Sequence, residues 1–419
     1  MTTECPAGRP RAAPAPLWRN RDFMLLWGSQ AVSTVGVRAS AMAYPLLVLA
    51  ITGSPAKAGV VGFAQTLPYV LFYLPAGALV DRWDRRRVML ACDAGRAVAI
   101  GSIAVAVVLD RATLVQIALA AFTEGSFFVF FQLSESAALP RVVHRSQLSG
   151  ALARNQAREY GAELAGQPLG ALLFGFGHML PFLFDALSYV VSFGCVSLVR
   201  AAFQEERQRS RASLWAEVRE GLGWLFRQRF LVYLVVLIGA TNVVFSALPL
   251  VMIVRARRLG ASPALIGAMF VFLGVGAVLG SLVAPWVQRH LAGRTVIAGS
   301  LWSWAVGLAA LPLLGDPVPL GAVVATTSVV GPAFNVLVAS YRYALAPDRL
   351  QARSQSAARL VTWGTIPLGN LAGGFLLESV GPVPSFVVLA ALMLAIALAA
   401  TATPTIRRAP DVATLQPTP

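Results

Sequence analysis

Gly77-Ala-Leu-Val-Asp-Arg-Trp-Asp-Arg-Arg-Arg-Val-Met89 is the stretch of this sequence that decides the fold. It joins two apolar runs, 58–80 and 88–109, through the residues 81–87, of which all but Trp83 are charged. An apolar helical run of about 20 residues is as long as the hydrocarbon layer of a bilayer is thick. The stretch is therefore predicted to be a short polar loop between two membrane-spanning helices.

The composition of the whole chain agrees with a membrane protein. Of its 419 residues 57% are hydrophobic and 13% charged, and the mean hydropathy is +0.68. A soluble domain has about 25% charged residues. Because backbone polar groups inside lipid must bond within their own segment, each span is expected to be an α-helix. Twelve spans are predicted, at 23–50, 58–80, 88–109, 113–138, 156–177, 179–200, 229–253, 263–287, 295–314, 318–341, 357–378 and 382–403.

Basic residues are distributed very unequally between the two sets of loops. Twenty-seven of them lie in the tails and in the loops after even-numbered spans, whereas five lie in the opposite loops. Because positive residues concentrate on the cytoplasmic side, both termini are predicted to be cytoplasmic. The cluster of Arg255, Arg257 and Arg258 is an exception on the outer side, and the sequence offers no physical explanation for it.

One long connection divides the chain into two halves. Segment 201–228 is rich in Arg and Glu, and its apolar residues Trp215, Val218, Leu222 and Leu225 recur at helical spacing. We expect an amphipathic linker along the membrane surface, and a partner-binding site is the alternative. The predicted organisation is a cytoplasmic tail (1–22), a six-helix bundle (23–200), the cytoplasmic linker (201–228), a second six-helix bundle (229–403) and a cytoplasmic tail (404–419).

The two halves show weak internal similarity. Gly77-Ala-Leu-Val80 has a counterpart in Gly280-Ser-Leu-Val283, and each closes the second span of its half before a Trp and a basic loop. Leu139-Pro140 and Ala346-Pro347 likewise each follow the fourth span. Repeats of this kind are typical of transporters whose substrate site lies between two bundles at mid-membrane.

The stretch 77–89 resembles the loop 2–3 signature of the major facilitator superfamily, G-x-L-a-D-r-x-G-r-k-x-x-l, with Asp84 where the pattern has Gly. Its D-R-x-D-R-R form is similar to the branch of macrolide-type drug exporters and siderophore exporters. The resemblance implies an all-α polytopic membrane protein with twelve transmembrane helices in two pseudo-symmetric six-helix bundles, energised by an ion gradient. It continues through Leu17–Phe23, Thr52–Pro55, Asn155–Ala157 and Phe184–Ala186.

The resemblance also implies a conformational latch. In this family the loop acid is thought to hold the halves together by meeting a helix N-terminus in the other half, where partial positive charge resides. Asp81 stands at this position, with the helix starting near Ser356 as its seat, and a plain loop charge is the alternative. Asp93 and Arg96 are expected to pair beside the loop. Arg82, Arg85 and Arg86 belong to the same region, where topology signals and anionic-lipid contacts are the alternative.

Ionisable side chains within a span are costly, so each is a functional candidate by default. Glu124, Glu163 and Asp185 are candidates for loading and releasing a proton as access alternates, and structural hydrogen bonds are the alternative. Arg38 lies deep in span one and either compensates Glu124, attracts an anionic substrate or forms a fixed interhelical ion pair.

The second half has no acid within its spans before Glu378 at an outer edge, and it offers aromatic surface instead. Phe245, Trp302, Trp304 and Trp363 are therefore the predicted substrate-cavity residues. In span five, Gly161, Gly166, Pro168 and Gly170 resemble an incomplete form of the exporter signature G-P-x-x-G-G. The small residues there predict close helix packing.

Several function classes are not supported by the sequence. It has no nucleophile-base constellation, phosphate loop or metal-ligand spacing, so we expect neither an enzyme nor a cofactor. Its Arg clusters are split among membrane-flanking loops, which argues against nucleic acid. The preferred hypothesis is a monomeric, proton-coupled exporter of an amphiphilic small molecule in the bacterial plasma membrane, in contact with lipids. The alternatives are a siderophore or other metabolite carrier, an uncoupled facilitator, or a sensor or scaffold on the same fold.

The charge distribution makes a direct topological prediction. Reporter fusions at the amino and carboxyl ends are expected to be active in the cytoplasm, and a fusion at Arg111 is expected to be active outside. An amino and a carboxyl end on opposite faces would contradict the predicted even number of spans.

Overall fold

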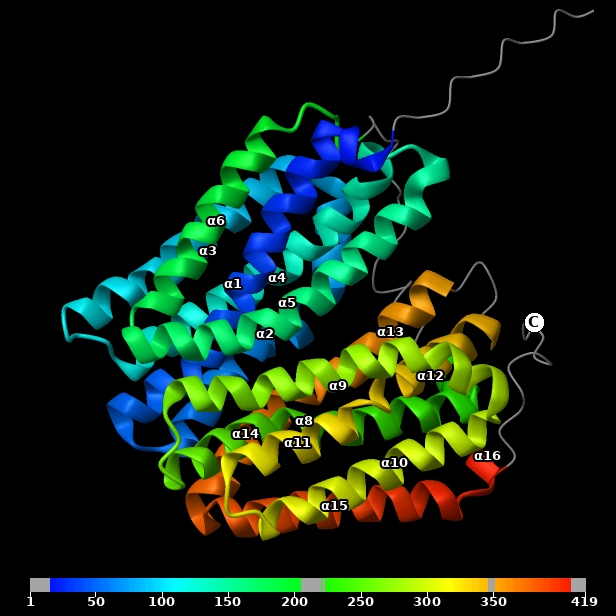
Figure 1. The fold of residues 1–419 in the computed structure, drawn as a ribbon. Coiled ribbons are helices and arrows are strands. Elements are labelled where there is room, and N and C mark those ends of the chain that lie inside the picture. Colours follow the sequence, from blue (N-terminus) through cyan, green and yellow to red (C-terminus); the bar gives the residue numbers. More distant parts are fainter. Residues whose placement is uncertain (1–15, 205–219, 221–222, 346–350, 408–419) are drawn as a thin grey trace, which may run out of the picture.

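The computed structural model describes residues 16–204, 220, 223–345 and 351–407, including all their side chains except those of Ala78, Asp81, Tyr343 and 351–357. Within these ranges the chain forms helices and no strand (Figure 1). The first half consists of α1 (Arg21–Thr52), α2 (Pro55–Arg82), α3 (Arg85–Val108), α4 (Leu114–Val142), α5 (Leu148–Phe176) and α6 (Leu180–Leu198). The second half consists of α8 (Arg229–Arg258), α9 (Pro263–His290), α10 (Gly293–Ala310), α11 (Pro317–Ser328), α12 (Gly331–Leu345), α13 (Gln351–Gly364), α14 (Ile366–Val380) and α15 (Pro382–Ala402).

The predicted all-α membrane fold is confirmed. Among the described residues eleven helical segments are long and apolar enough to cross a bilayer. The remaining predicted span is α5, which has membrane length but carries several charges. These charges are largely paired: Glu163 lies 3.0 Å from Arg38, and Arg158 lies 2.8 Å from Glu135. Paired charges let a polar helix lie within the bundle at a lower cost.

The spans predicted at 318–341 and 357–378 are found at Pro317–Arg342 and Ala358–Val380, and each is interrupted within its length. The tenth span is interrupted between α11 and α12, just before Gly331-Pro332. The eleventh is interrupted at Thr365, and Pro367 is an early residue of α14. Proline lacks a backbone N–H and disfavours helix in the residue before it, which accounts for both breaks.

Helix ends are fixed by local capping. Asn20, Ser54, Asp84 and Thr113 each accept a hydrogen bond from the backbone N–H three residues on. Gly53 ends α1 with φ of 66°, which is a left-handed conformation that suits glycine. These caps explain why the short loops, 53–54 and 83–84, lie within the Thr52–Pro55 and Asp81–Arg87 segments.

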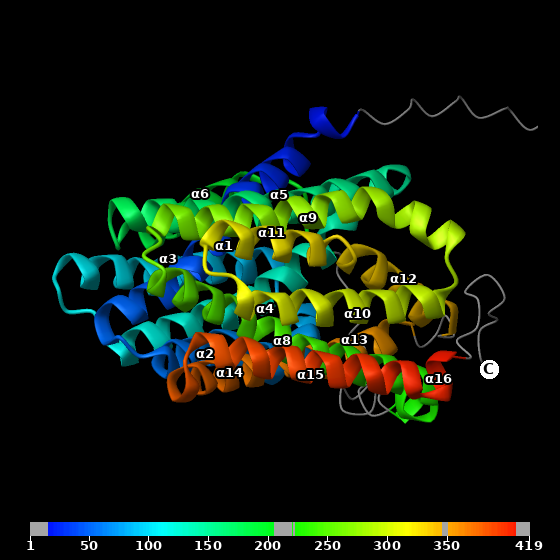
Figure 2. The ribbon, with the colours of Figure 1, turned by 60° about the horizontal axis from the view of Figure 1, so that its bottom comes forward.

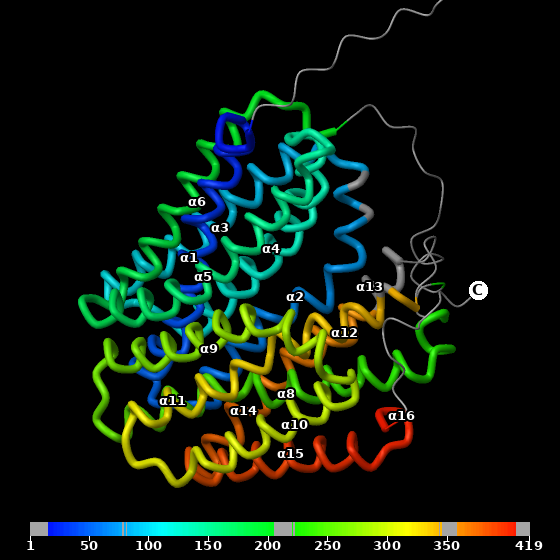
Figure 3. The backbone as a smooth tube through the Cα atoms, turned by 45° about the vertical axis from the view of Figure 1, so that its right-hand side comes forward, coloured from blue at the N-terminus to red at the C-terminus, as the bar shows by residue number. Residues whose placement is uncertain are grey.

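The two halves meet through two reciprocal helix pairs. Figure 2 shows α5 beside α9 and α2 beside α14. In each pair the second span of one half contacts the fifth span of the other, as a pseudo-twofold arrangement requires. Away from these pairs the two bundles diverge toward the side where α1 begins and α15 ends (Figures 1 and 3).

Glycines bring the backbones of the two halves close together. A Cβ at Gly59 of α2 would lie 2.9 Å from the Cα of Gly374 of α14. A Cβ at Gly267 of α9 would lie 3.0 Å from the carbonyl oxygen of Pro168 of α5. Small residues are what permits such contact between helices in a membrane.

Most of the predicted linker, including Trp215, Val218 and Leu222, lies outside the described residues, as do parts of both tails. Leu225, near the end of the linker, is buried in a cluster with Leu231 of α8 and Ala358 of α13. The chain that enters the second half is thus anchored to the bundle.

The glycine contacts of α5 can be tested with a matched pair of variants. A Cβ at Gly170 would lie 2.3 Å from the Ala39 carbonyl oxygen, whereas nothing lies within 4 Å of one at Gly161. We expect Gly170→Ala to lose about 1–3 kcal/mol of stability through forced separation of α1 and α5. Gly161→Ala is expected to be neutral or stabilising by about 0.5–1 kcal/mol. Melting temperatures of the purified variants check this, and equal melting temperatures would contradict it.

Candidate functional site

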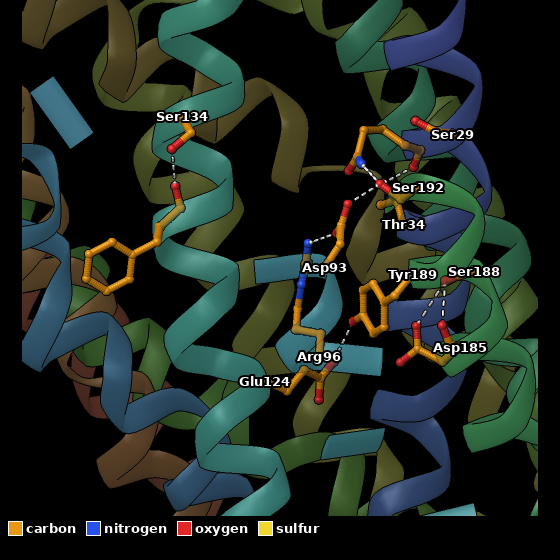
Figure 4. Close-up of polar contacts among 12 residues, drawn as sticks. Ser29, Thr34, Asp93, Arg96, Glu124, Ser134, Asp185, Ser188, Tyr189 and Ser192 are labelled. Carbon is orange, nitrogen blue, oxygen red and sulfur yellow. Dashed lines mark hydrogen bonds and ion pairs between the residues drawn. The ribbon is translucent and has the colours of Figure 1, made fainter. Parts of the chain in front are cut away.

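A buried polar cluster occupies the interior of the first half (Figure 4). It contains Asp93 and Arg96 of α3, Glu124 of α4 and Asp185 of α6, each of which is at most 2% exposed. Three acids and one guanidinium thus share a space from which water is largely excluded.

Asp93 and Arg96 form the expected pair. Arg96 Nη2 lies 2.6 Å from Asp93 Oδ1, and the Ser192 hydroxyl donates to Asp93 Oδ2 at 2.6 Å. The guanidinium carbon of Arg96 lies 4.5 Å and 4.4 Å from the ring centres of Phe131 and Tyr189. Arg96 therefore has its charge balanced by Asp93 and its faces covered by aromatic rings.

Glu124 is surrounded by neutral hydrogen-bond donors. The hydroxyl of Tyr44 donates to Oε2 at 2.9 Å and that of Tyr189 to Oε1 at 3.2 Å, while the Gln65 amide lies 3.5 Å from Oε2. These partners come from α1, α6 and α2, so one carboxyl group joins four helices. The sequence did not reveal these partners, because spacing along one helix does not identify neighbours on another.

Asp185 also relies on hydroxyl groups. Ser40 of α1 donates to its Oδ2 at 2.6 Å, and Ser188 lies 3.4 Å from Oδ1. A Cβ at Gly36 would lie 2.6 Å from Oδ1, so only glycine leaves room for this carboxyl. Among the described residues, no arginine or lysine forms an ion pair with Glu124 or Asp185.

Glu163 lies outside this cluster. It forms an ion pair with Arg38 between α5 and α1, and its Oε1 accepts from the Gln167 amide at 2.9 Å. The side chains of Arg38 and Glu163 are 38% and 30% exposed. Of the three interpretations of Arg38, the structure shows the interhelical ion pair, and its partner is Glu163 and not Glu124.

Four of the residues predicted to form the latch make contacts within the first half. Arg85 is buried and donates to the carbonyl oxygens of Ala137 and Phe203 at 2.9 Å and 3.1 Å. Arg86 donates to the Ser197 carbonyl oxygen, and Arg82 is exposed. These contacts of Arg85, Arg86, Asp93 and Arg96 lie within the first half, and the part of these residues in a latch stays a prediction. The side chain of Asp81 lies outside the described residues.

Two polar contacts that the sequence did not reveal do join the halves. On the side toward the termini, Arg359 of α13 donates to the Tyr73 hydroxyl of α2 at 2.7 Å. Trp363 packs there, with its ring centre 5.8 Å from the ring centres of Tyr69 and Tyr73.

The second contact lies at the opposite end of α2. Glu378 of α14 accepts hydrogen bonds from the Ser54 hydroxyl and, at 2.8 Å, from the Ala56 backbone N–H. More than one helical turn farther along α2, the Asn370 amide of α14 donates to the Gly62 carbonyl oxygen at 3.1 Å. A carboxylate at the N-terminus of α2 is favoured by the helix dipole, so this contact holds the two halves together at their closed end.

The predicted substrate-cavity residues divide into three groups. Phe245 and Trp304 line one cavity of about 260 Å³ in the second half. Trp302 instead lines a separate groove between α10 and α15, with Val387 and Leu394, and so does not belong to that cavity. Trp363 lies at the contact between the halves. Trp302 and Trp304 therefore lie on different faces of α10, and the substrate-binding role of these aromatic residues stays a prediction.

The outer arginine cluster has a local role. Arg255, Arg257 and Arg258 occupy the last turn of α8, where cations are favoured by the helix dipole. Arg255 also donates to the Leu314 carbonyl oxygen at 3.0 Å, at the end of the short helix η3 (Leu311–Leu313). These arginines therefore stabilise a helix end, which accounts for their exceptional position.

Comparison with known proteins identifies related sequences along nearly the whole chain. Residues 12–417 match the family model described as transmembrane secretion effector. The chain is 24% identical to the multidrug efflux pump Tap of Mycolicibacterium fortuitum, over 87% of this chain and 91% of that one. It is 26% identical to Tap of Mycobacterium tuberculosis, over 93% and 94% of the two chains. Macrolide efflux protein A of Streptococcus pyogenes is 23% identical, over 70% and 73%.

Solved structures share the fold at low sequence identity. A variant of the nucleoside transporter NupG superposes with a TM-score of 0.72 at 14% identity, covering 90% of this chain and 98% of that one. A bacterial homologue of the iron transporter ferroportin in an inward-facing state superposes with a TM-score of 0.69 at 15% identity, covering 91% and 100%.

The Glu378 contact predicts how the closed end behaves. We expect Glu378→Ala to loosen this end, because the N-terminus of α2 loses its carboxylate partner from the other half. Spin labels at Arg111→Cys and Gly315→Cys, in a background without native cysteines, should then show a shift toward longer distances. Ser379→Ala, on the neighbouring exposed residue, is the control and should leave the distances unchanged. Identical distance distributions in both variants would contradict a holding role for Glu378.

Proposed function

We propose, from the premise that this chain belongs to the transmembrane secretion effector family, that it exchanges protons for an amphiphilic small molecule. The chain is an efflux transporter with the fold of the major facilitator superfamily. The proposal adds the coupling ion, the residues that bind it and the orientation in the bacterial plasma membrane.

The single observation that carries the proton proposal is the pair of buried carboxyls that form no ion pair with any described cation. Asp93 is neutralised by Arg96, but Glu124 and Asp185 have only neutral partners among the described residues. Burying an uncompensated carboxylate costs several kcal/mol even after local relaxation. A bound proton removes this cost, so Glu124 and Asp185 are the proposed proton-binding pair, whereas Glu163 has Arg38 as its counter-ion.

Alternating access follows from the contacts between the halves. With both termini cytoplasmic, the end held by Glu378 faces outward and the diverging end faces the cytoplasm. Release to the outside then requires Glu378 and the glycine contacts of α2 and α14 to separate. The halves would rock about the α2–α14 and α5–α9 pairs, as in other transporters built from repeats.

Asp81 is proposed as the inner latch of the opposite state. Its partner would be the N-terminus of α13, which begins at Gln351, five residues before the predicted seat near Ser356. This contact and the Glu378 contact would then act at opposite ends of α2, each using a carboxylate against a helix N-terminus.

The protein is further proposed to act as a monomer surrounded by lipid, since the pseudo-twofold partner of each half is the other half of the same chain. An anionic cargo such as a siderophore is less well supported. Within the described part of the chain, Arg38 is already compensated by Glu163.

A coupling test separates proton binding from transport itself. In liposomes, Glu124→Gln and Asp185→Asn are expected to reduce accumulation of an antibiotic driven by a pH gradient about tenfold or more, because proton binding no longer biases the two states. Both variants should retain substrate exchange in the absence of a gradient. Glu159→Gln, a partly exposed acid on α5, is the control and should retain gradient-driven accumulation. Unchanged gradient-driven flux in both test variants would overturn the assignment of the proton site.

A further inference from the structure

The cavity of about 260 Å³ lies inside the second half and not simply between the two halves. It is formed by α8, α9, α10, α11 and α12, and one residue, Tyr160 of α5, comes from the first half. None of its described lining residues is charged. A small-molecule site is typically apolar with a few oriented polar groups, and this cavity has that character.

Aromatic side chains form one wall of the cavity. The ring centre of Trp304 lies 5.0 Å from that of Phe245 and 5.2 Å from that of Phe334, both in edge-to-face packing. The Trp304 indole N–H donates to the Thr327 carbonyl oxygen at 2.9 Å. Its hydrogen-bonding capacity is thereby used, so the wall presents an apolar surface to a ligand.

Two polar groups at the cavity have no hydrogen-bond partner among the described residues. Neither the Tyr160 hydroxyl nor the Asn335 amide forms a hydrogen bond with any described residue, although both side chains line the cavity and are exposed. Tyr160 belongs to the first half and Asn335 to the second. A ligand that used both would therefore contact both halves.

We infer that this cavity binds the apolar ring system of an uncharged amphiphile, whose hydrogen-bonding group lies between Tyr160 and Asn335. A charged group would lose its hydration there without gaining a counter-ion, which is strongly unfavourable. The inference rests on the proposed export function, and it adds the binding site and the charge class of the substrate.

Two probes with the same ring skeleton test the charge class. N-phenyl-1-naphthylamine is neutral and has one N–H donor, and 8-anilinonaphthalene-1-sulfonate adds an anionic group. Binding to the full chain in nanodiscs is measured as saturable energy transfer from tryptophan to the probe, with empty nanodiscs as the blank. The neutral probe is expected to bind at least about tenfold more tightly than the sulfonate, because the sulfonate must be desolvated. Equal affinities would overturn the inferred preference for an uncharged ligand.

Two alanines on opposite faces of α9 test the location. Ala277 lines the cavity, whereas Ala268, nine residues earlier, is exposed and about 180° away around the helix. Ala277→Phe is expected to reduce the affinity for the neutral probe about tenfold or more by filling the cavity. Ala268→Phe should leave it unchanged. Unchanged binding in Ala277→Phe would overturn the location.

Two milder variants keep the inference testable if Ala277→Phe does not fold. Tyr160→Phe and Asn335→Ala change exposed groups. At least one of them is expected to lower the affinity for the neutral probe about fivefold, which is the effect of one lost hydrogen bond. If neither weakens it, the polar part of the inference is wrong. Because these measurements use no gradient, Glu124→Gln should bind the probe normally. Unchanged proton coupling in Glu124→Gln, with intact probe binding, would contradict only the proposed function.

Discussion

The exclusion of water from the membrane interior is the constraint on which this structure depends. It forces every span to be helical, and it requires each buried charge to find a partner. Helix α1 supplies three of these partners along its length: Arg38 for Glu163, Ser40 for Asp185 and Tyr44 for Glu124. The acids of α4, α5 and α6 are therefore organised around one central helix, which also explains why Gly36 and the α1 contact of Gly170 leave no room for side chains.

The two halves share a fold but bury different kinds of residue. Among the described residues, the buried carboxyl and guanidinium groups lie in the first half, and the apolar cavity lies in the second. This separation has a physical advantage, because a charged group beside an apolar ligand would have to be desolvated each time the ligand bound. The proposed proton site and the proposed substrate cavity do not touch. They would therefore be coupled through the movement of helices and not through direct competition for one carboxyl.

The sequence predicted the architecture well because lipid imposes it through composition alone. Twelve segments, their short loops and the duplicated halves follow from apolar length and basic loops. The breaks at Thr365 and before Gly331 were missed, although Pro367 and Pro332 were visible signals.

Glu124 and Asp185 were recognised as unusual, but their partners were not, since contacts between helices are not encoded by spacing. One signal was available: Asp185, Ser188 and Ser192 form a polar stripe at helical spacing on an otherwise apolar α6. The contacts of Arg85 and Arg86 within the first half were not predicted, because a loop charge does not show which half it contacts.

Helix α5 is the element that connects the proposed proton site with the cavity. On one side it packs against α1 through Gly166 and Gly170 and is tied to it by the Arg38–Glu163 pair. On another side its Pro168 and Leu164 meet the glycines of α9, and Tyr160, one turn before Glu163, reaches the cavity. In the proposed cycle, a change in the hydrogen bonds of Tyr44 and Ser40 on proton binding would shift α1, and α5 would have to follow because no side chain separates the two backbones. Close packing of this kind resists gradual deformation and favours two discrete arrangements, which is what alternating access requires.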